Sequence, residues 1–444
     1  MKPTAFTQNF WAQSDRIFWA GILLGLGLSW WYACNQIVDG DQLQMIHKGY
    51  LGAYQSVWLS FGNAASVVGN VPGSLLAWVV GGPLIVWDSP YAPMLFLILV
   101  RLAGFLMLDA VVRKVFPESG LMRLTFLLLC WLNPWFLFDS LLYNPAYLIF
   151  CVGLHCWTAW HMQHGRSFMT TLGHVLAIGI AMQLHFSWPL LVFLSALLFY
   201  RGLLKVNWLA VLVAVALIVF SLLPYIMELL TDPSLARNSD PETHSRYIGW
   251  GAVNVYPVLK SALYWLRYGS WSFPSKLVNN TDFQWLDIHF LQMVLVFAWK
   301  ALLGILGAVT VVIAAIANIT AFNHIRARLR RTSPAEVTPV DWMLIYAMAG
   351  FIAALISAGL APLVFNYWHL TLIFPVALFP ILFWTDKYLS REMRRNATGF
   401  VVVCLIFLLV NLVALNDSRK FSYSVDYAQQ TMDYVHKEIG MSPR

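Results

Sequence analysis

Charged residues are scarce in this sequence: they make up 11% of its 444 residues, against about 25% in soluble domains. This scarcity excludes an ordinary soluble globule, a disordered chain and a coiled coil. Cysteine is also rare. The five cysteines lie in apolar stretches without any CxxC pair, as expected of small buried hydrophobic residues. The sequence has no P-loop, GxGxxG or HExxH motif, no zinc-type Cys/His cluster and no internal repeat.

Hydrophobic residues dominate instead, at 59% of the chain, and the aromatic residues include 21 Trp. A spanning helix needs about 20 apolar residues, and a longer apolar stretch, 170–200, is broken at Ser187-Trp188-Pro189 into two short spans. The sequence therefore predicts an all-α polytopic membrane protein with about 11 transmembrane helices, at 17–37, 93–112, 121–138, 145–160, the two parts of 170–200, 207–227, 291–318, 341–361, 366–384 and 397–415.

The positive charges follow a topological pattern. With a cytoplasmic N-terminus, most basic residues fall in short connections on the cytoplasmic side, as the positive-inside rule requires. This pattern explains the net charge of +7 without a nucleic-acid partner. The opposite side holds most of the acidic residues. We therefore expect one integral-membrane domain, 1–444, with its function on the non-cytoplasmic face, in an outer loop at 38–92, a large outer loop at 228–290 and an outer tail at 416–444.

Two carboxylates, Asp39 and Asp41, follow the first predicted span directly. A carboxylate at the membrane surface can accept a proton from a hydroxyl group as a general base. Asp41 is also suited to be a helix N-cap, with Gln44 as its capping-box partner. Spacings of three and four predict an amphipathic helix over 43–61 that lies in the headgroup plane, and the apolar piece 74–86 is the length of an interfacial segment.

These features resemble the GT-C glycosyltransferases, a superfamily that includes lipid A aminoarabinose transferases and protein O-mannosyltransferases. The resemblance rests on an acid just outside the first span and on a long loop of membrane-surface helices. Three short motifs support it: Leu99-Val100-Arg101-Leu102-Ala103-Gly104, Asn133-Pro134…Asp139…Asn144-Pro145, and Tyr427-Ala428-Gln429-Gln430…Tyr434-Val435.

The resemblance implies a fold, a donor and a reaction. The fold would be a helix bundle with a cavity on the non-cytoplasmic side, and the donor a sugar on a polyprenyl phosphate. The sugar would pass to a hydroxyl group of a lipid, glycan or protein acceptor, with Asp41 or Asp39 as the base. No cofactor is implied, although a divalent metal remains an option. Short outer loops and the lack of a retention signal favour a bacterial inner membrane, with the active site facing the periplasm.

Cations are expected near the phosphate of the leaving group, where negative charge develops. Lys260 and Arg267 are seven residues apart, on one face of a helix predicted over about 252–268, and Lys48 is the basic residue of the first outer loop. The alternative is a solvated basic loop beside anionic headgroups. The candidate phosphate-binding residues are Lys48, Arg246, Lys260, Arg267 and Lys276.

Four further residues are candidates for substrate binding. The family position of Asp139 implies a substrate-binding carboxylate, and the alternative is a turn residue that caps backbone N–H groups. His185 either lines the sugar site or makes a hydrogen bond at the membrane edge. Tyr367 and His369 either contact the sugar or belong to the aromatic belt. Arg101, inside a predicted span, would pair with an acid between helices or reach a phosphate.

Two other functions remain open. A lipid or oligosaccharide transporter or flippase would need polar residues through the bilayer and an internal repeat, and neither is convincing in this sequence. A polysaccharide polymerase or ligase is also a membrane glycosyltransferase, but it would be expected to have Arg-rich outer loops.

Overall fold

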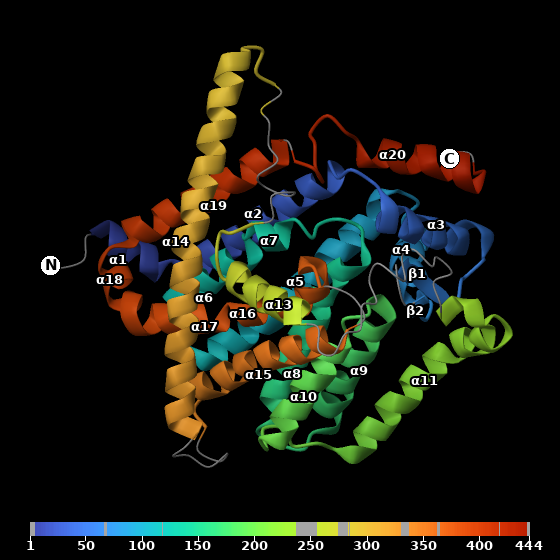
Figure 1. The fold of residues 1–444 in the computed structure, drawn as a ribbon, viewed down its shortest axis with the longest axis horizontal. Coiled ribbons are helices and arrows are strands. Elements are labelled where there is room, and N and C mark those ends of the chain that lie inside the picture. Colours follow the sequence, from blue (N-terminus) through green and yellow to red (C-terminus); the bar gives the residue numbers. More distant parts are fainter. Residues whose placement is uncertain are drawn as a thin grey trace.

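The protein is mainly helical in a computed structural model (Figure 1). Residues 5–65, 69–117, 119–236, 255–273, 283, 285–329, 337–361, 365–416 and 418–441 are described. Among these residues the only sheet is a two-stranded hairpin. The all-α fold predicted from the sequence is therefore confirmed in its helical character.

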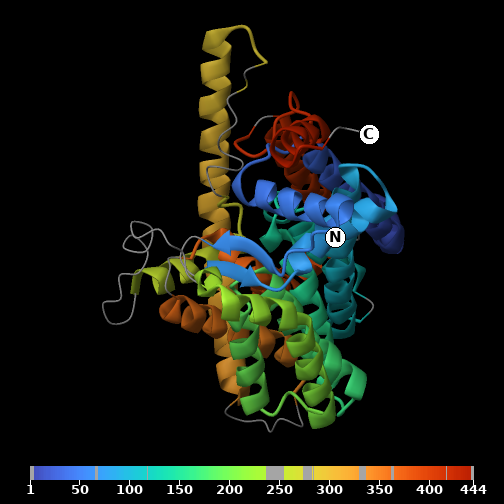
Figure 2. The same cartoon turned by 90° about the vertical axis from the view of Figure 1, so that its right-hand side faces the viewer.

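In the part of the chain that the structure describes, six helical segments are long and apolar enough to cross a membrane. Two of them, α11 and α14, expose most of their apolar side chains and lie at the edge of the bundle, as expected where lipid replaces protein contacts (Figures 1 and 2). The six are α2 (Ser14–Cys34), α5 (Tyr91–Val115), α11 (Trp208–Thr231), α14 (His289–Leu329), α15 (Pro339–Leu360) and the segment Tyr367–Arg395.

The other predicted spans correspond to shorter helices. The break predicted within 170–200 is confirmed, because α9 ends at Leu184 and α10 begins at Pro189. Five of these shorter helices correspond to predicted spans: α6 (Gly120–Phe126) with the π-helix η1 (Leu127–Trp131), α8 (Leu148–Met162), α9 (Phe168–Leu184), α10 (Pro189–Tyr200) and α19 (Ala397–Asn416).

Two predicted spans are less regular than expected. The segment expected at 121–138 is interrupted at Asn133, and Pro134 starts a separate short helix, α7 (Pro134–Leu137). The segment expected at 366–384 begins as the 3-10 helix η5 (Tyr367–Ile373). It continues in short pieces, because Pro375 and Pro380 lack the N–H that a continuous helix would use. These pieces are α16 (Phe374–Ala377), α17 (Phe379–Trp384), the π-helix η6 (Thr385–Leu389) and α18 (Ser390–Arg395).

The first outer loop differs from its prediction in the bounds of its first helix and in a hairpin that follows it. The helix expected over 43–61 is α3 (Gly40–Gln55), which ends where Ser56 adopts a left-handed φ of 58°. The hairpin that follows, β1 (Phe61–Ala65) and β2 (Gly69–Pro72), was not predicted. Its register pairs Phe61 with Pro72, Ala64 with Asn70 and Ala65 with Gly69. The helix expected at 74–86 is present as α4 (Leu75–Val86).

The remaining elements are short and lie mainly at the ends of the bundle. Among them, α13 and α20 carry residues that the sequence analysis singled out. They are α1 (Ala5–Ala12), the 3-10 helices η2 (Asn144–Tyr147) and η3 (Pro233–Ala236), α13 (Val255–Tyr268), α20 (Tyr427–Tyr434) and the π-helix η7 (Val435–Ile439).

Two glycines allow α5 and α8 to pack closely. A Cβ atom on Gly104 would lie 2.6 Å from the carbonyl oxygen of Ile149, and Gly153 faces the backbone of Gly104. Small residues at helix crossings let backbones approach in this way in membrane proteins.

A buried hydrogen-bond network joins four helices of the bundle. His155 of α8 bonds through its two ring nitrogens to Tyr346 of α15 (2.7 Å) and to Ser195 of α10 (2.8 Å). His174 of α9 reaches the same Ser195 hydroxyl at 3.0 Å. Ser195 also donates to the Leu191 carbonyl, so both imidazoles donate to its oxygen. The network therefore satisfies the buried histidines and fixes how α8, α9, α10 and α15 pack.

Candidate functional site

The acidic pair of the first outer loop lies at the start of α3. Asp39 precedes the helix in extended conformation, and its N–H donates to the Gln42 side chain at 3.2 Å. The alternative role predicted for Asp41, an N-cap paired with Gln44, is therefore wrong: the N-cap is Asp39, and its partner is Gln42. Gly40 adopts a φ of 46°, in the left-handed region that favours glycine, and turns the chain into the helix between the two acids.

Both acids reach the surface, but their surroundings differ. Asp39 pairs with Lys420 of the C-terminal tail, with 3.5 Å between the carboxylate oxygen and Nζ. The side chain of Asp41 makes no ion pair within the described chain. The protein around it removes enough water to raise its pKa above the ordinary value; Lys420 opposes this rise and Asp39 adds to it.

The C-terminal tail pairs with the segment that precedes α3. Ile37 donates its N–H to the Lys420 carbonyl at 2.8 Å, and Ser422 donates to the Asn35 carbonyl at 3.0 Å. Gln430 of α20 accepts from the Val38 N–H at 3.3 Å. In Figure 1, α20 correspondingly lies along α3, far from it in sequence. The tail thus holds the backbone that carries the acidic pair.

Lys48 follows Asp41 by seven residues, which is almost two full helical turns. It therefore lies on the same face of α3, about 10 Å further along the helix axis. Its side chain is 8% exposed, and its ammonium group lies 5.5 Å from the centre of the Phe61 ring. Within the described chain it has no carboxylate or hydrogen-bond partner. Burial lowers the pKa of Lys48 to about 8. A buried cation without an anion is a candidate site for a negatively charged ligand.

A second group of polar residues is buried behind this loop, in the turn after α7. Asp139 is 6% exposed and accepts a hydrogen bond from the Tyr143 hydroxyl at 2.9 Å. Burial raises the pKa of Asp139 to about 6, against the opposing effects of Arg101 and Tyr143. Arg101 of α5 is 1% exposed; it donates to the Ser140 hydroxyl at 2.7 Å and to the Phe136 carbonyl. Arg101 therefore anchors this turn, and its charge favours the ionised form of Asp139.

The predicted basic residues of α13 face the same region. Arg267 donates to the Ser272 carbonyl at 2.8 Å, and its guanidinium group lies 5.1 Å from the Tyr264 ring. Lys260 donates to the Asn366 side chain at 2.6 Å. Burial lowers the pKa of both groups, and for Lys260 the charge of Arg267 adds to this effect. Both residues lie on α13, which spans most of the helix predicted over 252–268.

Two histidines predicted to bind substrate lie close together. The rings of His185 and His369 are 5.5 Å apart. The Nδ1 atom of His185 accepts from the Ser187 N–H at 3.2 Å, and that of His369 accepts from the Asn366 N–H at 2.9 Å. A neutral imidazole that accepts at Nδ1 carries its proton on Nε2. Burial lowers the pKa of His185 to about 4, so it is neutral at pH 7. Each ring therefore offers an Nε2–H donor that has no partner within the described chain.

The remaining predicted residue of this group, Tyr367, begins η5. Its carbonyl accepts from the Tyr268 hydroxyl, and its ring lies 5.9 Å from that of Trp135. Thus six predicted residues gather where α7, α9, α13 and η5 come together: Asp139, His185, Lys260, Arg267, Tyr367 and His369.

One side chain connects the acidic pair to this buried group. The side-chain oxygen of Gln36 accepts one hydrogen bond from the Gln42 side chain, at 2.8 Å, and another from the Leu142 N–H, at 2.9 Å. It thereby fixes the first turn of α3 against the chain next to Tyr143. The sequence analysis did not single out Gln36, Asn366 or Lys420; the position of Asn366 just before Tyr367 is the one local signal that would have drawn attention to it.

Two predicted residues, Arg246 and Lys276, lie outside the described residues, so their positions are not assigned. Within the described ranges, no group of three or more His, Cys, Asp or Glu side chains gathers as a metal site would require.

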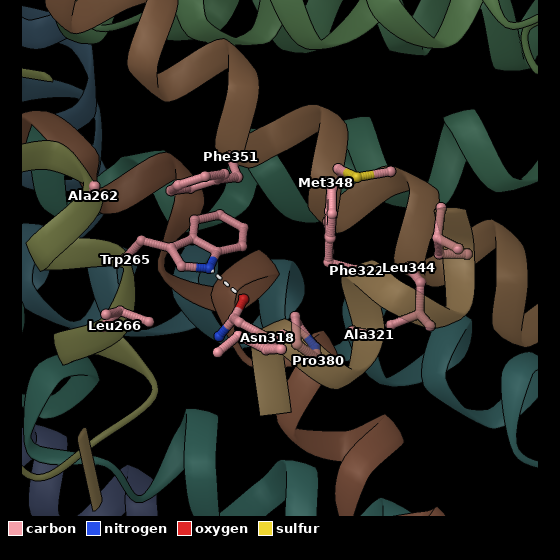
Figure 3. A pocket seen from close by; sticks show the side chains of 13 residues that line it. Ala262, Trp265, Leu266, Asn318, Ala321, Phe322, Leu344, Met348, Phe351 and Pro380 are labelled. Carbon is pink, nitrogen blue, oxygen red and sulfur yellow. Dashed lines mark hydrogen bonds between the residues drawn. The ribbon is translucent and has the colours of Figure 1, made fainter. Parts of the chain in front are cut away.

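An apolar cavity of about 300 Å³ lies on the other face of α13 (Figure 3). Its polar groups satisfy each other, because the Trp265 indole N–H donates to Asn318 at 2.8 Å. None of the predicted site residues lines it. The walls are Ala262, Trp265, Leu266, Asn318, Ile319, Ala321, Phe322, Ile325, Leu344, Ala347, Met348, Phe351 and Pro380.

Comparisons with known proteins leave the chain without an assigned family: no family model matches it, and no curated protein or solved structure is significantly similar.

Proposed function

We propose that this protein is a membrane glycosyltransferase that moves a sugar from a polyprenyl phosphate to an acceptor hydroxyl on the non-cytoplasmic face. The observation that carries the proposal is on α3, where Asp41 and the buried, anion-free Lys48 share one face. The first is suited to accept a proton and the second to bind a phosphate.

The reaction assigns a role to each end of this helix face. Asp41 takes the proton of the acceptor hydroxyl, whose oxygen forms a bond to the anomeric carbon of the sugar. The bond from that carbon to the phosphate oxygen breaks, and the electron pair leaves with the polyprenyl phosphate beside Lys48. The separation of about 10 Å accommodates the acceptor oxygen, the anomeric carbon and the phosphate, with hydrogen bonds of about 3 Å at both ends.

The buried group contributes binding in this proposal. His185 and His369 donate from Nε2 to sugar hydroxyl groups, and Tyr367 packs beside them. Lys260 and Arg267 extend the positive charge toward the leaving phosphate, and Arg246 and Lys276 remain candidates for the same role. The apolar cavity on the opposite face of α13 (Figure 3) gives an isoprenoid chain a place across this helix from these cations.

The proposal includes a placement in the membrane. The eleven spans are α2, α5, α6 with η1, α8, α9, α10, α11, α14, α15, the segment from η5 to η6, and α19. The first outer loop, the large loop and the tail then lie outside the cytoplasm, in the periplasm of a bacterium. The fold is that of the GT-C enzymes in this proposal.

The test is sugar transfer in proteoliposomes that contain the full chain, with a pool of radiolabelled polyprenyl-phosphate sugars and membrane lipid extract. The variant with both Asp39→Asn and Asp41→Asn should insert and fold but transfer no sugar. Full activity in that variant would refute the mechanism. Movement of the labelled lipid across the bilayer without a covalent product would favour the flippase instead.

A further inference from the structure

A second cavity, of about 320 Å³, separates α9 from α11 below the outer loop. Figure 1 shows α11 leaning away from α9 toward the hairpin, so that α4 lies over the widening gap. Three helices form the walls, and none of the lining residues is charged. They are Ser74, Leu75 and Trp78 of the α4 region, Leu176, Gly179, Ile180 and Gln183 of α9, and Leu217, Ile218 and Ser221 of α11.

Polar atoms without a partner lie at one end of this cavity. Gln183 is 8% exposed, and its amide N–H donates to the Ser221 hydroxyl at 2.9 Å. That hydroxyl donates to the Ile218 carbonyl at 2.7 Å, so it has no further proton to offer. Within the described chain, neither the Gln183 side-chain oxygen nor the Ser74 hydroxyl makes a hydrogen bond. Gln183 is buried and Ser74 is half-buried, so both atoms are free to bond to a ligand or water in the cavity.

An aromatic ring lies beside these atoms. Trp78 is 47% exposed, and its ring stacks on Trp58 at 3.8 Å with an angle of 6° between the planes. The stack holds the indole in a fixed orientation at the mouth of the cavity. A fixed aromatic ring is suited to pack against the apolar face of a ring-shaped ligand.

The other end of the cavity is apolar and open. Leu176 and Ile180 of α9 face Leu217 and Ile218 of α11, and Leu217 is 48% exposed. Because α11 is long and apolar enough to span a membrane, this end opens toward the hydrocarbon region. An occupant therefore needs an apolar chain at this end and hydrogen-bonding groups at the other.

We propose that this cavity binds a lipid with an uncharged, polyhydroxylated headgroup, such as a glycolipid. A headgroup hydroxyl donates to the Gln183 oxygen, another bonds to Ser74, the sugar ring packs on Trp78, and an acyl chain lies between α9 and α11. The absence of charge among the lining residues disfavours a phosphate headgroup. The cavity in Figure 3 differs, because its Trp265–Asn318 pair is already satisfied and leaves no polar atom for a headgroup.

The last step rests on the proposed function: the lipid bound in this cavity is the acceptor of the transferred sugar. Gln183 lies two residues before His185, so a headgroup at Gln183 is near the turn that carries one of the sugar-binding candidates. The binding itself does not depend on transfer.

The test uses the full chain in nanodiscs with a photoreactive glucosyl diacylglycerol, and with the same diacylglycerol without sugar as the comparison probe. We expect the glycolipid to label peptides of α4, α9 and α11. Gln183→Leu should reduce this labelling about ten-fold, because a headgroup hydroxyl loses its acceptor. Ser74→Ala should reduce it less and leave folding unchanged, because the hydroxyl of this N-cap residue makes no hydrogen bond to α4.

Two further variants separate the cavity from the helix surface. Ser221→Phe fills the cavity and should abolish labelling. Val215→Phe adds a ring to the same helix outside the cavity and should leave labelling unchanged. Equal labelling by the sugar-free probe, or unchanged labelling in Gln183→Leu and Ser221→Phe, would overturn the inference. Specific labelling without sugar transfer would contradict the proposed function alone, and transfer without specific labelling would contradict this inference alone.

Discussion

The two acidic regions, at the start of α3 and in the turn after α7, differ in what surrounds their carboxylates. At the start of α3, Asp39 and Asp41 reach the surface, and one of them pairs with a tail lysine. In the turn after α7, Asp139 is buried beside Tyr143, and the fully buried Arg101 anchors the same turn. The exposed acids are open to a substrate hydroxyl, whereas the buried acid is tied to the packing of the bundle. We therefore expect the carboxylates at the start of α3 to act in catalysis and the Asp139 carboxylate to contribute to stability.

The largest effect should come from Asp41→Asn. The amide cannot take the hydroxyl proton, so sugar transfer should fall about 10²- to 10⁴-fold, while the melting temperature stays unchanged. Initial rates in proteoliposomes and thermal unfolding measure the two effects.

Asp433→Asn is the matched control, since Asp433 is also exposed but lies on α20. It should keep full activity. If Asp39→Asn loses the activity and Asp41→Asn keeps it, the base is Asp39.

Asp139→Asn should mainly lower the stability of the protein, whereas Asp41→Asn mainly lowers its activity. The variant leaves the buried Arg101 without the nearby carboxylate that offsets its charge, and it puts an amide in place of the buried carboxylate that accepts from Tyr143, a change that costs about 1–3 kcal/mol. We expect a clear loss of stability in chemical unfolding of the purified protein.

The double variant Asp139→Asn, Arg101→Met should recover part of that loss, because the unpaired charge is gone. Additive losses in the double variant would show that the two groups are not coupled, and the contrast between the two acidic regions would weaken.

Lys48 should make donor binding depend on pH. Its pKa of about 8 means that the ammonium is charged below pH 8 and loses its charge as the pH rises through that value. Donor affinity should therefore be highest below pH 8 and fall above it.

Lys48→Arg should keep donor binding at alkaline pH, and Lys48→Met should raise KM at every pH with a smaller change in kcat. A KM for Lys48→Met equal to that of the wild type would remove Lys48 from the phosphate site.

The smallest effect should come from Lys420→Met. Lys420 lowers the pKa of Asp41, so its loss should raise that pKa further and move the acid limb of the pH–rate profile to higher pH. The exposed ion pair with Asp39 contributes less than about 1 kcal/mol, so stability should hardly change.

Lys437→Met on η7 is the control, since that lysine pairs with Glu438 instead. An unshifted profile in Lys420→Met would show that the tail positions the backbone but does not tune the acid.

Several features could be predicted from local sequence. The apolar runs predicted the long spans, and the Ser187-Trp188-Pro189 break separated α9 from α10 where the structure has it. Turn chemistry was harder to predict. The N-cap moved from Asp41 to Asp39 because Gly40 adopts a left-handed conformation, which the sequence permits but does not require. The hairpin at 61–72 lacked a strong alternation of polar and apolar residues.

The sequence by itself determined that this chain belongs in a membrane, because the free energy of apolar burial is roughly additive along each helix. It also located the acids, bases and histidines on particular segments. Only the tertiary structure decided which of them are partners. The burial of Lys48 without an anion, the tail beside Asp39, the facing rings of His185 and His369 and the open oxygen of Gln183 all depend on packing between segments far apart in sequence. Electrostatic and hydrogen-bond energies depend on these distances and on local exposure, which no local pattern encodes.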